Sequence, residues 1–201
     1  MPDLEALLRR VAVDLDAAGA RWAVVGALAV AIRTEPRFTR DIDLAVAVDS
    51  DPQAESLVLS LRNCGYDVVA TTEHESSGRI AMVRMTPTDE TPAAAIVDLL
   101  FATSGIESEI VEDADSLEVL PGLRLRVATT GQLIALKLLS ASEDRPHDRG
   151  DLRALFGEAL PTDLDSARHA LALISDRGYN RGRDLQRALD EAIATWPQGD
   201  P

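Results

Sequence analysis

Two aspartates one residue apart, Asp41 and Asp43, are the residues whose type and spacing most directly suggest chemistry. In a β-strand, residues i and i+2 point to the same face, so both carboxylates would reach one or two hard cations while Ile42 and Leu44 face the other side. Mg²⁺ suits such a pair, because it takes one or two carboxylates together with water and substrate phosphates. We therefore predict that Asp41 and Asp43 bind Mg²⁺ or Mn²⁺; the alternative is a pair of strand-end aspartates held by a base such as Arg40.

A third aspartate, Asp98, lies in the apolar stretch Ala-Ile-Val-Asp-Leu-Leu-Phe. An unpaired carboxylate would be costly there. Two interpretations are open: Asp98 is a further metal ligand on a neighbouring strand, or it is satisfied by a salt bridge.

A possible phosphate site precedes the aspartate pair. Gly26 and Ala27 end an apolar strand and open a helix, where free backbone amides and the helix dipole favour phosphate. The segment that follows carries Arg37, Thr39 and Arg40, which could add to that site. The simpler interpretation of Gly26 is an ordinary turn between a strand and a helix.

The chain has one lysine, Lys137, against 19 arginines. It falls on a predicted helix that is apolar almost all round, where a charge needs a reason. Its ammonium could neutralise nucleotide phosphates, or it could extend to solvent or pair with Asp144. Asp148 and Asp151 open the next predicted helix, where they could complete the site or complement the positive end of that helix.

The elements that must position these side chains follow from hydrophobic periodicity and turn residues. We expect helices over 3–18, 27–32, 51–62, 129–142, from 146 onward, 163–175 and 183–196, and strands over 22–25, 41–48, 66–70, 79–85, 94–101, 117–120 and 123–127. Residues 106–113 fit a helix or coil. Strands end near residue 128, so the sequence predicts an α/β core over 1–128 and a helical part over 129–201.

Composition limits the partners. The 34 acidic and 20 basic residues give a net charge of −14, which argues against attachment to nucleic acid or anionic membrane by bulk charge. The arginines at 177, 181, 183 and 187 form a basic run, which we assign to the last helix as a solvated face or a local nucleic-acid contact.

The only cysteine, Cys64, cannot form an internal disulfide, and the longest apolar run, 22–32, is too short to span a bilayer. No signal peptide is evident at the N-terminus. We expect a cytoplasmic protein that makes no membrane contact, and we favour a monomer.

The segment Val25-Gly-Ala-Leu-Ala-Val-Ala-Ile-Arg-Thr-Glu-Pro-Arg-Phe-Thr-Arg-Asp-Ile-Asp-Leu resembles the first motif of the DNA polymerase β-type nucleotidyltransferases, Gly-[Gly/Ser]-x₉₋₁₃-Asp-x-[Asp/Glu]. It is most similar to the AbiEii/MenT branch of bacterial toxins. A second stretch, 129–152, is similar to that branch's lysine followed by Arg-x-x-Asp-x-x-Asp-Leu. One departure is Ala27, where many relatives have Ser or Gly, so phosphate contacts would shift to backbone amides, Thr39 and nearby arginines.

The resemblance implies a nucleotidyltransferase core, a mixed β-sheet flanked by helices, followed by a C-terminal helical part. It also implies a metal-dependent enzyme that transfers NMP from an NTP, with the metal held by Asp41, Asp43 and a further carboxylate. Asp98, or Asp148 and Asp151 from the helical part, would supply that carboxylate. Lys137, Arg37 and Arg40 would offset the charge of the departing pyrophosphate.

By the same resemblance, the protein would be a toxin that modifies an RNA such as the tRNA 3′ end and is neutralised by a cognate antitoxin. Three alternatives stay open. The acceptor could be a protein hydroxyl, which the net charge of −14 favours, or a small molecule such as an antibiotic. The fold could also be an inactive binding module, although the intact Asp41, Asp43 and Lys137 argue against this.

Overall fold

The computed structural model describes residues 4–35, 39–74, 77–88, 96–141 and 146–196 of the chain. Its helices are α1 (Leu4–Ala17), α2 (Gly26–Arg33), α3 (Asp51–Asn63), α4 (Glu107–Asp113), α5 (Thr130–Ser140), α6 (Pro146–Glu158), α7 (Pro161–Asp176) and α8 (Leu185–Thr195). Its strands are β1 (Arg21–Val25), β2 (Asp41–Ala47), β3 (Tyr66–Glu73), β4 (Ile80–Pro87), β5 (Ile96–Leu100), β6 (Asp115–Leu120) and β7 (Leu123–Val127). These elements match the predicted ones, with shifts of a few residues at their ends. The start of the strand predicted over 94–101 lies outside the described residues.

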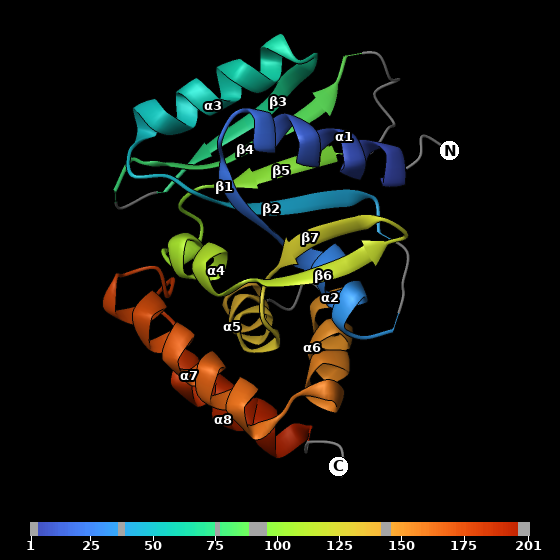
Figure 1. The fold of residues 1–201 in the computed structure, drawn as a ribbon. Coiled ribbons are helices and arrows are strands. Elements are labelled where there is room, and N and C mark those ends of the chain that lie inside the picture. The colour runs from blue at the N-terminus through green and yellow to red at the C-terminus, as the bar shows by residue number, and fades with distance from the viewer. Residues whose placement is uncertain (1–3, 36–38, 75–76, 89–95, 142–145, 197–201) are drawn as a thin grey trace.

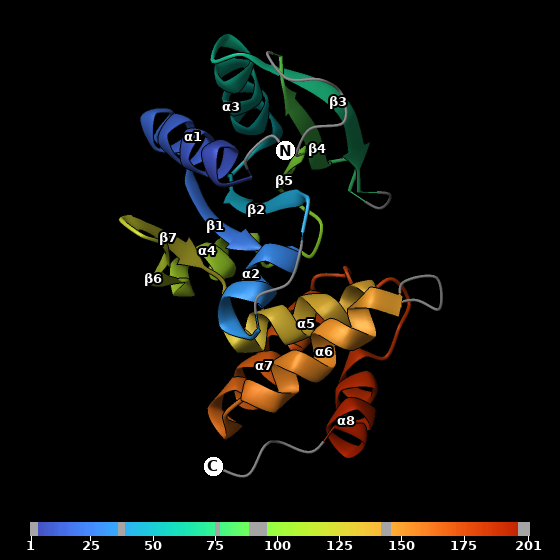
Figure 2. The same ribbon diagram turned by 90° about the vertical axis from the view of Figure 1, so that its right-hand side faces the viewer.

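The strands form one mixed sheet in the order β3-β4-β5-β2-β1-β7-β6. β2 pairs antiparallel with β1 and parallel with β5, and it stands in the centre of the sheet. In Figure 2, α1 and α3 lie on one side of this sheet, and α2 lies on the other side together with the C-terminal helices. This is the predicted α/β architecture.

The helices after β7 pack on one another below the sheet (Figure 1). Within this group α5 lies against α6 and α7, and it also contacts α2 of the sheet layer. A Thr129–Gln132 capping box fixes the start of α5: each side chain bonds the backbone amide of the other residue. The proposed boundary at residue 128 falls between β7 and α5, where strands give way to helices.

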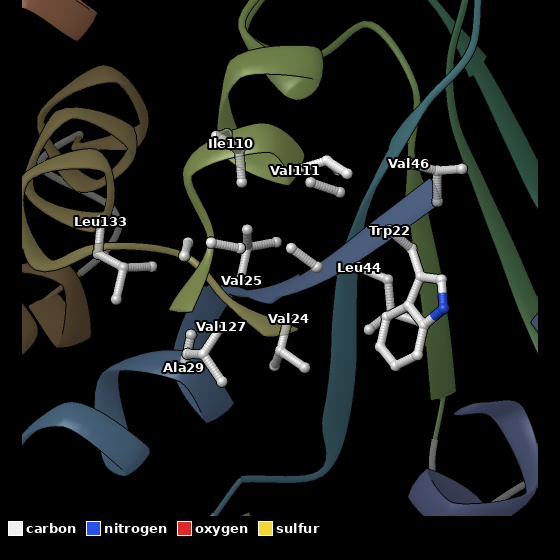
Figure 3. Packing of buried hydrophobic residues seen from close by; sticks show 14 of the residues in the cluster. Trp22, Val24, Val25, Ala29, Leu44, Val46, Ile110, Val111, Val127 and Leu133 are labelled. Carbon is white, nitrogen blue, oxygen red and sulfur yellow. The ribbon is translucent and has the colours of Figure 1, made fainter. Parts of the chain in front are cut away.

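One hydrophobic cluster runs from Leu7 to Ala192 and so crosses that boundary. Figure 3 shows side chains of this cluster gathered around β1, among them Val24, Val25 and Leu133. Because α5 is packed into the same core as β1, the residues that α5 and β1 present to each other are held at a fixed separation. Among the described residues, no helix is long and apolar enough to cross a membrane.

Candidate active site

The turn from β1 into α2 is built around the Asp43 side chain. Val25 of β1 stands opposite Asp43 of β2, and Gly26 follows with φ +64°. A Cβ atom at Gly26 would lie 2.0 Å from Asp43 Oδ2 and 2.7 Å from Asp43 Cβ. Glycine is therefore required twice at this position, for the left-handed backbone and for the space that the carboxylate occupies.

Asp43 also takes the place of a helix cap. Val25 offers no side-chain capping bond to α2, and the backbone amide of Ala27 donates a hydrogen bond to the Asp43 carboxylate instead. The first turn of a helix has unsatisfied N–H groups and a partial positive charge, so it stabilises an anion.

A row of charged side chains crosses the sheet at the level of Asp43. Asp43 on β2 is opposite Asp98 on β5, and Asp98 is opposite Arg84 on β4. Directly opposed residues of neighbouring strands share a face of the sheet, so all three point to the same side. Arg84 Nε donates to Asp98 Oδ1 at 2.8 Å and Arg84 Nη2 donates to Asp98 Oδ2 at 2.7 Å. Asp98 and Arg84 thus form a bidentate salt bridge.

Burial, together with the neighbouring carboxylates, raises the pKa of Asp43 to about 6, from an ordinary value of 3.8. Burial is the largest cause, followed by the negative charges of Asp98 and Asp41; Lys137 and the Ala27 amide act in the opposite direction. The Asp98 carboxylate raises the pKa of Arg84. Metal-free Asp43 is therefore a carboxylate whose charge is only partly compensated by its surroundings.

Lys137 reaches the site from α5. Its Nζ lies 2.9 Å from Asp148 Oδ1 and 2.7 Å from Asp151 Oδ2, two aspartates one turn apart on α6. The side chains of both aspartates are less than a tenth exposed, and that of Lys137 is 14% exposed. The two carboxylates fix the direction of the ammonium group.

These residues meet at a cavity of about 420 Å³ between the sheet and α5. Its charged lining comes from Asp43, Arg84, Asp98, Lys137 and Arg181, and Gly26 and Ala27 also line it. The cavity therefore combines carboxylates, cations and the start of a helix.

The structure brings together Gly26, Ala27, Asp43, Asp98 and Lys137, which the sequence placed in one candidate site. Asp148 and Asp151 contact the cavity through Lys137. Asp41 and Asp43 are partly exposed while Ile42 and Leu44 are buried, so the alternation predicted for this strand is present.

Other predicted residues stand apart from the cavity lining. Thr39 donates a hydrogen bond to the backbone carbonyl of Asp41 at 3.3 Å, and Arg40 is exposed. Arg37 lies outside the described residues, as does Asp144, the predicted alternative partner of Lys137.

The described residues contain no group of three or more His, Cys, Asp or Glu side chains arranged to hold a metal ion. Asp98, which was expected as the third carboxylate beside Asp41 and Asp43, is bound by Arg84, and its role as a metal ligand stays a prediction. The Asp41 and Asp43 pair still fits a divalent cation, because Mg²⁺ needs only one or two carboxylates beside substrate phosphates. The raised pKa of Asp43 marks a negative charge that such a cation would offset.

Two cationic residues of the site were not predicted. Arg84 is part of an alternating strand, and only the register of β4 with β5 reveals its partner. Arg181 belongs to the basic run that the sequence assigned to the last helix. That assignment is wrong: α8 begins at Leu185, and the arginines at 177, 181 and 183 lie in the connection before it.

Comparison with known proteins adds the family. The sequence matches, over residues 6–198, the model of a family described as the nucleotidyl transferase AbiEii toxin of type IV toxin–antitoxin systems. No curated protein sequence matches the chain. The family match confirms the resemblance drawn from the motifs.

Solved structures share the fold at low identity. An antigenic nucleotidyltransferase-like protein from Paracoccidioides brasiliensis is 18% identical, with a TM-score of 0.54 over 93% of this chain and 92% of that one. ANT(2″)-Ia in complex with adenylyl-2″-tobramycin is 15% identical, with a TM-score of 0.51 over 95% and 97%. MenT4, a nucleotidyltransferase toxin from Mycobacterium tuberculosis, is 14% identical, with a TM-score of 0.35 over 94% and 92%. The first two confirm a nucleotidyltransferase fold.

Proposed function

Because the chain belongs to the AbiEii nucleotidyl transferase toxin family, we propose that this nucleotidyltransferase transfers NMP from an NTP to an RNA acceptor such as the tRNA 3′ end. The observation that carries the proposal is the cavity in which the Gly26 turn, the Asp43 carboxylate and the Lys137 ammonium meet. Each of these groups has a distinct task in handling a triphosphate.

The triphosphate would bind at the start of α2. Gly26 and Ala27 of the first helical turn line the cavity, and the helix dipole favours an anion there. Ala27 has no hydroxyl to offer, so we assign further phosphate contacts to Thr39, Arg37 and Arg40 of the segment between α2 and β2.

Asp41 and Asp43 would hold the divalent metal. When bound, Mg²⁺ or Mn²⁺ neutralises charge on the triphosphate and favours ionisation of the attacking hydroxyl. Asp43 is kept at a fixed position by Gly26 below it and by the Ala27 amide beside it. This preorganisation places a carboxylate at the same helix end that would receive the phosphates.

Lys137 would contact the phosphates. An ammonium group has three donors, and two of the directions are set by Asp148 and Asp151. We assign the remaining direction to a phosphate oxygen of the leaving pyrophosphate. In this proposal Asp148 and Asp151 orient the lysine.

The reaction is a displacement at the α-phosphorus. The acceptor hydroxyl oxygen bonds to the α-phosphorus while the bond from that phosphorus to the bridging oxygen of pyrophosphate breaks. The hydroxyl proton passes to the carboxylate of Asp98, which lies opposite Asp43 on the neighbouring strand. Addition of a nucleotide to a tRNA 3′ end would block aminoacylation, which fits a toxin that stops translation and is neutralised by a cognate antitoxin.

Acceptor classes can be sorted in one assay. The purified protein is incubated with Mg²⁺, each α-labelled NTP, total tRNA and cell lysate, and products are separated on a denaturing gel. We expect label in RNA that disappears in an Asp41→Asn variant of equal fold. Label in a protein band or a small-molecule product would replace RNA as the acceptor, and no label under any condition would contradict transferase activity.

A further inference from the structure

A second cavity, of about 550 Å³, adjoins the first. Both cavities are lined by Thr72, Thr103 and Arg181, so they meet at these three residues. The second cavity is completed mainly by residues of the β3–β4 hairpin, among them Glu73 and His74. It contains neither the Asp43 and Asp98 carboxylates nor Lys137, and its position beside the first cavity needs an explanation of its own.

The connection between α7 and α8 forms the outer wall of this second cavity. In Figure 1 that connection lies beside α4. Arg177 binds the Gly105 carbonyl and pairs with Glu109 of α4. Arg183 donates to three carbonyls at the end of α5, those of Leu138, Leu139 and Ala141. The connection is therefore tied to the sheet layer at one end and to α5 at the other.

Tyr179 fixes the same wall against the hairpin. Its ring stacks on His74 with a centroid separation of 4.1 Å and an interplanar angle of 26°. On the other side, a Cβ at Gly105 would lie 2.5 Å from Tyr179 Cδ2, so the ring is packed against a glycine. Tyr179 thus holds in place the His74 ring, which lines the second cavity.

Arg181 stands between these anchors. It has φ +54° and is the single non-glycine residue with a positive φ in the described part of the chain. Such backbone is costly for a side chain other than glycine or asparagine and persists where the surrounding structure imposes it. Its side chain lines both cavities, which places a guanidinium at their junction.

In-line displacement requires the acceptor to approach the α-phosphorus from the side opposite to pyrophosphate. An NTP bound in the first cavity would therefore need its acceptor in a space that joins that cavity at the reacting end. From this geometry we propose that the second cavity binds the single-stranded 3′ end of an RNA and that Arg181 binds the phosphodiester that precedes its 3′-terminal nucleotide. This inference rests on the proposed RNA acceptor.

The lining suits that ligand better than a peptide. Single-stranded RNA is bound by aromatic rings that stack with bases and by arginines that contact phosphates. His74, backed by the Tyr179 ring, offers the first, Arg181 the second, and the Thr72 hydroxyl offers a hydrogen bond to ribose or a base edge. A contact made by Arg181 alone also agrees with the net charge of −14, which leaves room only for local contacts with nucleic acid.

The test separates binding from chemistry. An RNA hairpin with a four-nucleotide single-stranded 3′ end is bound, by fluorescence anisotropy, to the Asp41→Asn protein, which holds the fold without transferring nucleotide. Arg181→Asn is added, because asparagine accepts the left-handed backbone and lacks the guanidinium. Arg187→Asn serves as the matched control, since Arg187 is a mostly exposed arginine of α8 paired with Glu191.

We expect Arg181→Asn to weaken RNA binding at least tenfold and to reduce the slope of log K against log salt by about 0.7, the value for one phosphate on a single strand. His74→Ala should weaken RNA binding without changing that slope. Arg187→Asn should bind as the parent does. A merely structural Arg181 would not change the salt slope.

RNA binding by Arg181→Asn equal to the parent, or no binding of the hairpin by the parent, would overturn the inference about this cavity. Neither result bears on nucleotidyl transfer, which is measured separately by the incorporation of label into RNA, protein or a small molecule. Transfer of label to a protein with no RNA binding would point to a peptide in the second cavity.

Discussion

Gly26→Ala is the substitution whose effect can be worked out most fully from the structure. The new Cβ would lie 2.0 Å from Asp43 Oδ2, 2.5 Å from its Cγ and 2.7 Å from its Cβ. Rotation about χ1 of Asp43 can relieve the first two contacts but leaves the third, because the Asp43 Cβ is fixed by the paired strand. β1 and β2 must therefore separate locally, or the turn must change.

Two costs add at this position. A left-handed alanine costs about 1–2 kcal/mol, and overpacking of a fitted contact costs about 1–3 kcal/mol more. We expect Gly26→Ala to lose about 2–5 kcal/mol of stability in urea unfolding. Displacement of the catalytic carboxylate by about 1 Å should lower nucleotide transfer about 100-fold.

Gly19→Ala is the matched control. Gly19 has φ +69°, and a Cβ there meets nothing within 4 Å, so this variant shows the backbone cost alone. Asp43→Ala should remove part of the stability loss caused by Gly26→Ala, and Asp43→Gly should remove all of the loss that comes from the contact. We expect a coupling energy between the two sites of about 1 kcal/mol or more in a double-mutant cycle. Equal stability losses in Gly26→Ala and Gly19→Ala, with transfer retained in both, would refute the fit between the turn and Asp43.

Three further predictions follow from the ion pairs of the site. Lys137→Met leaves its two buried carboxylate partners without a counter-charge and should lower the free energy of unfolding in urea by about 3–5 kcal/mol. Changing both partners to Asn should restore stability without restoring nucleotide transfer. Recovered transfer would mean that Lys137 has a structural role only. In metal-free protein the pKa of Asp43 rises from 3.8 to about 6 on folding, so the folded state binds more protons in that window and stability falls as pH rises through it. Asp43→Asn should therefore stabilise the protein at pH 7.5 by at most about 3 kcal/mol and not at pH 4, and an equal effect at both pH values would contradict this. Arg84→Met frees Asp98 to join a metal site and should tighten Mn²⁺ binding to nucleotide-free protein about tenfold by electron paramagnetic resonance, whereas unchanged binding would exclude Asp98 as a ligand.

Local patterns were sufficient to predict the elements and the acidic strand. The alternation of Asp41 and Asp43 with apolar residues depends only on the two-residue period of a strand, and the Thr129 cap of α5 depends only on its neighbours. The sequence therefore placed the acidic strand, the turn at Gly26 and the lysine helix correctly.

Contacts between distant segments could not be predicted in this way. The Arg84–Asp98 pair depends on the register of β4 with β5, and no signal within either strand specifies a register. Pairing of Lys137 with the aspartates of α6 depends on how α5 and α6 pack. Arg181 was grouped with the last helix by charge alone, although Asp184, which caps α8, marks where that helix begins.

In the proposed reaction, the protein transfers NMP from an NTP to an acceptor and uses Asp43 and Lys137 of this cavity. The most direct test supplies the protein with NTP labelled at the α-phosphate or at the γ-phosphate, in the presence of Mg²⁺ and total tRNA. We predict that only the α-label enters the acceptor. We also predict that the Asp43→Asn protein keeps its fold and transfers the label at least about 100-fold more slowly. Transfer of the γ-label, or undiminished α-label transfer by Asp43→Asn, would contradict it.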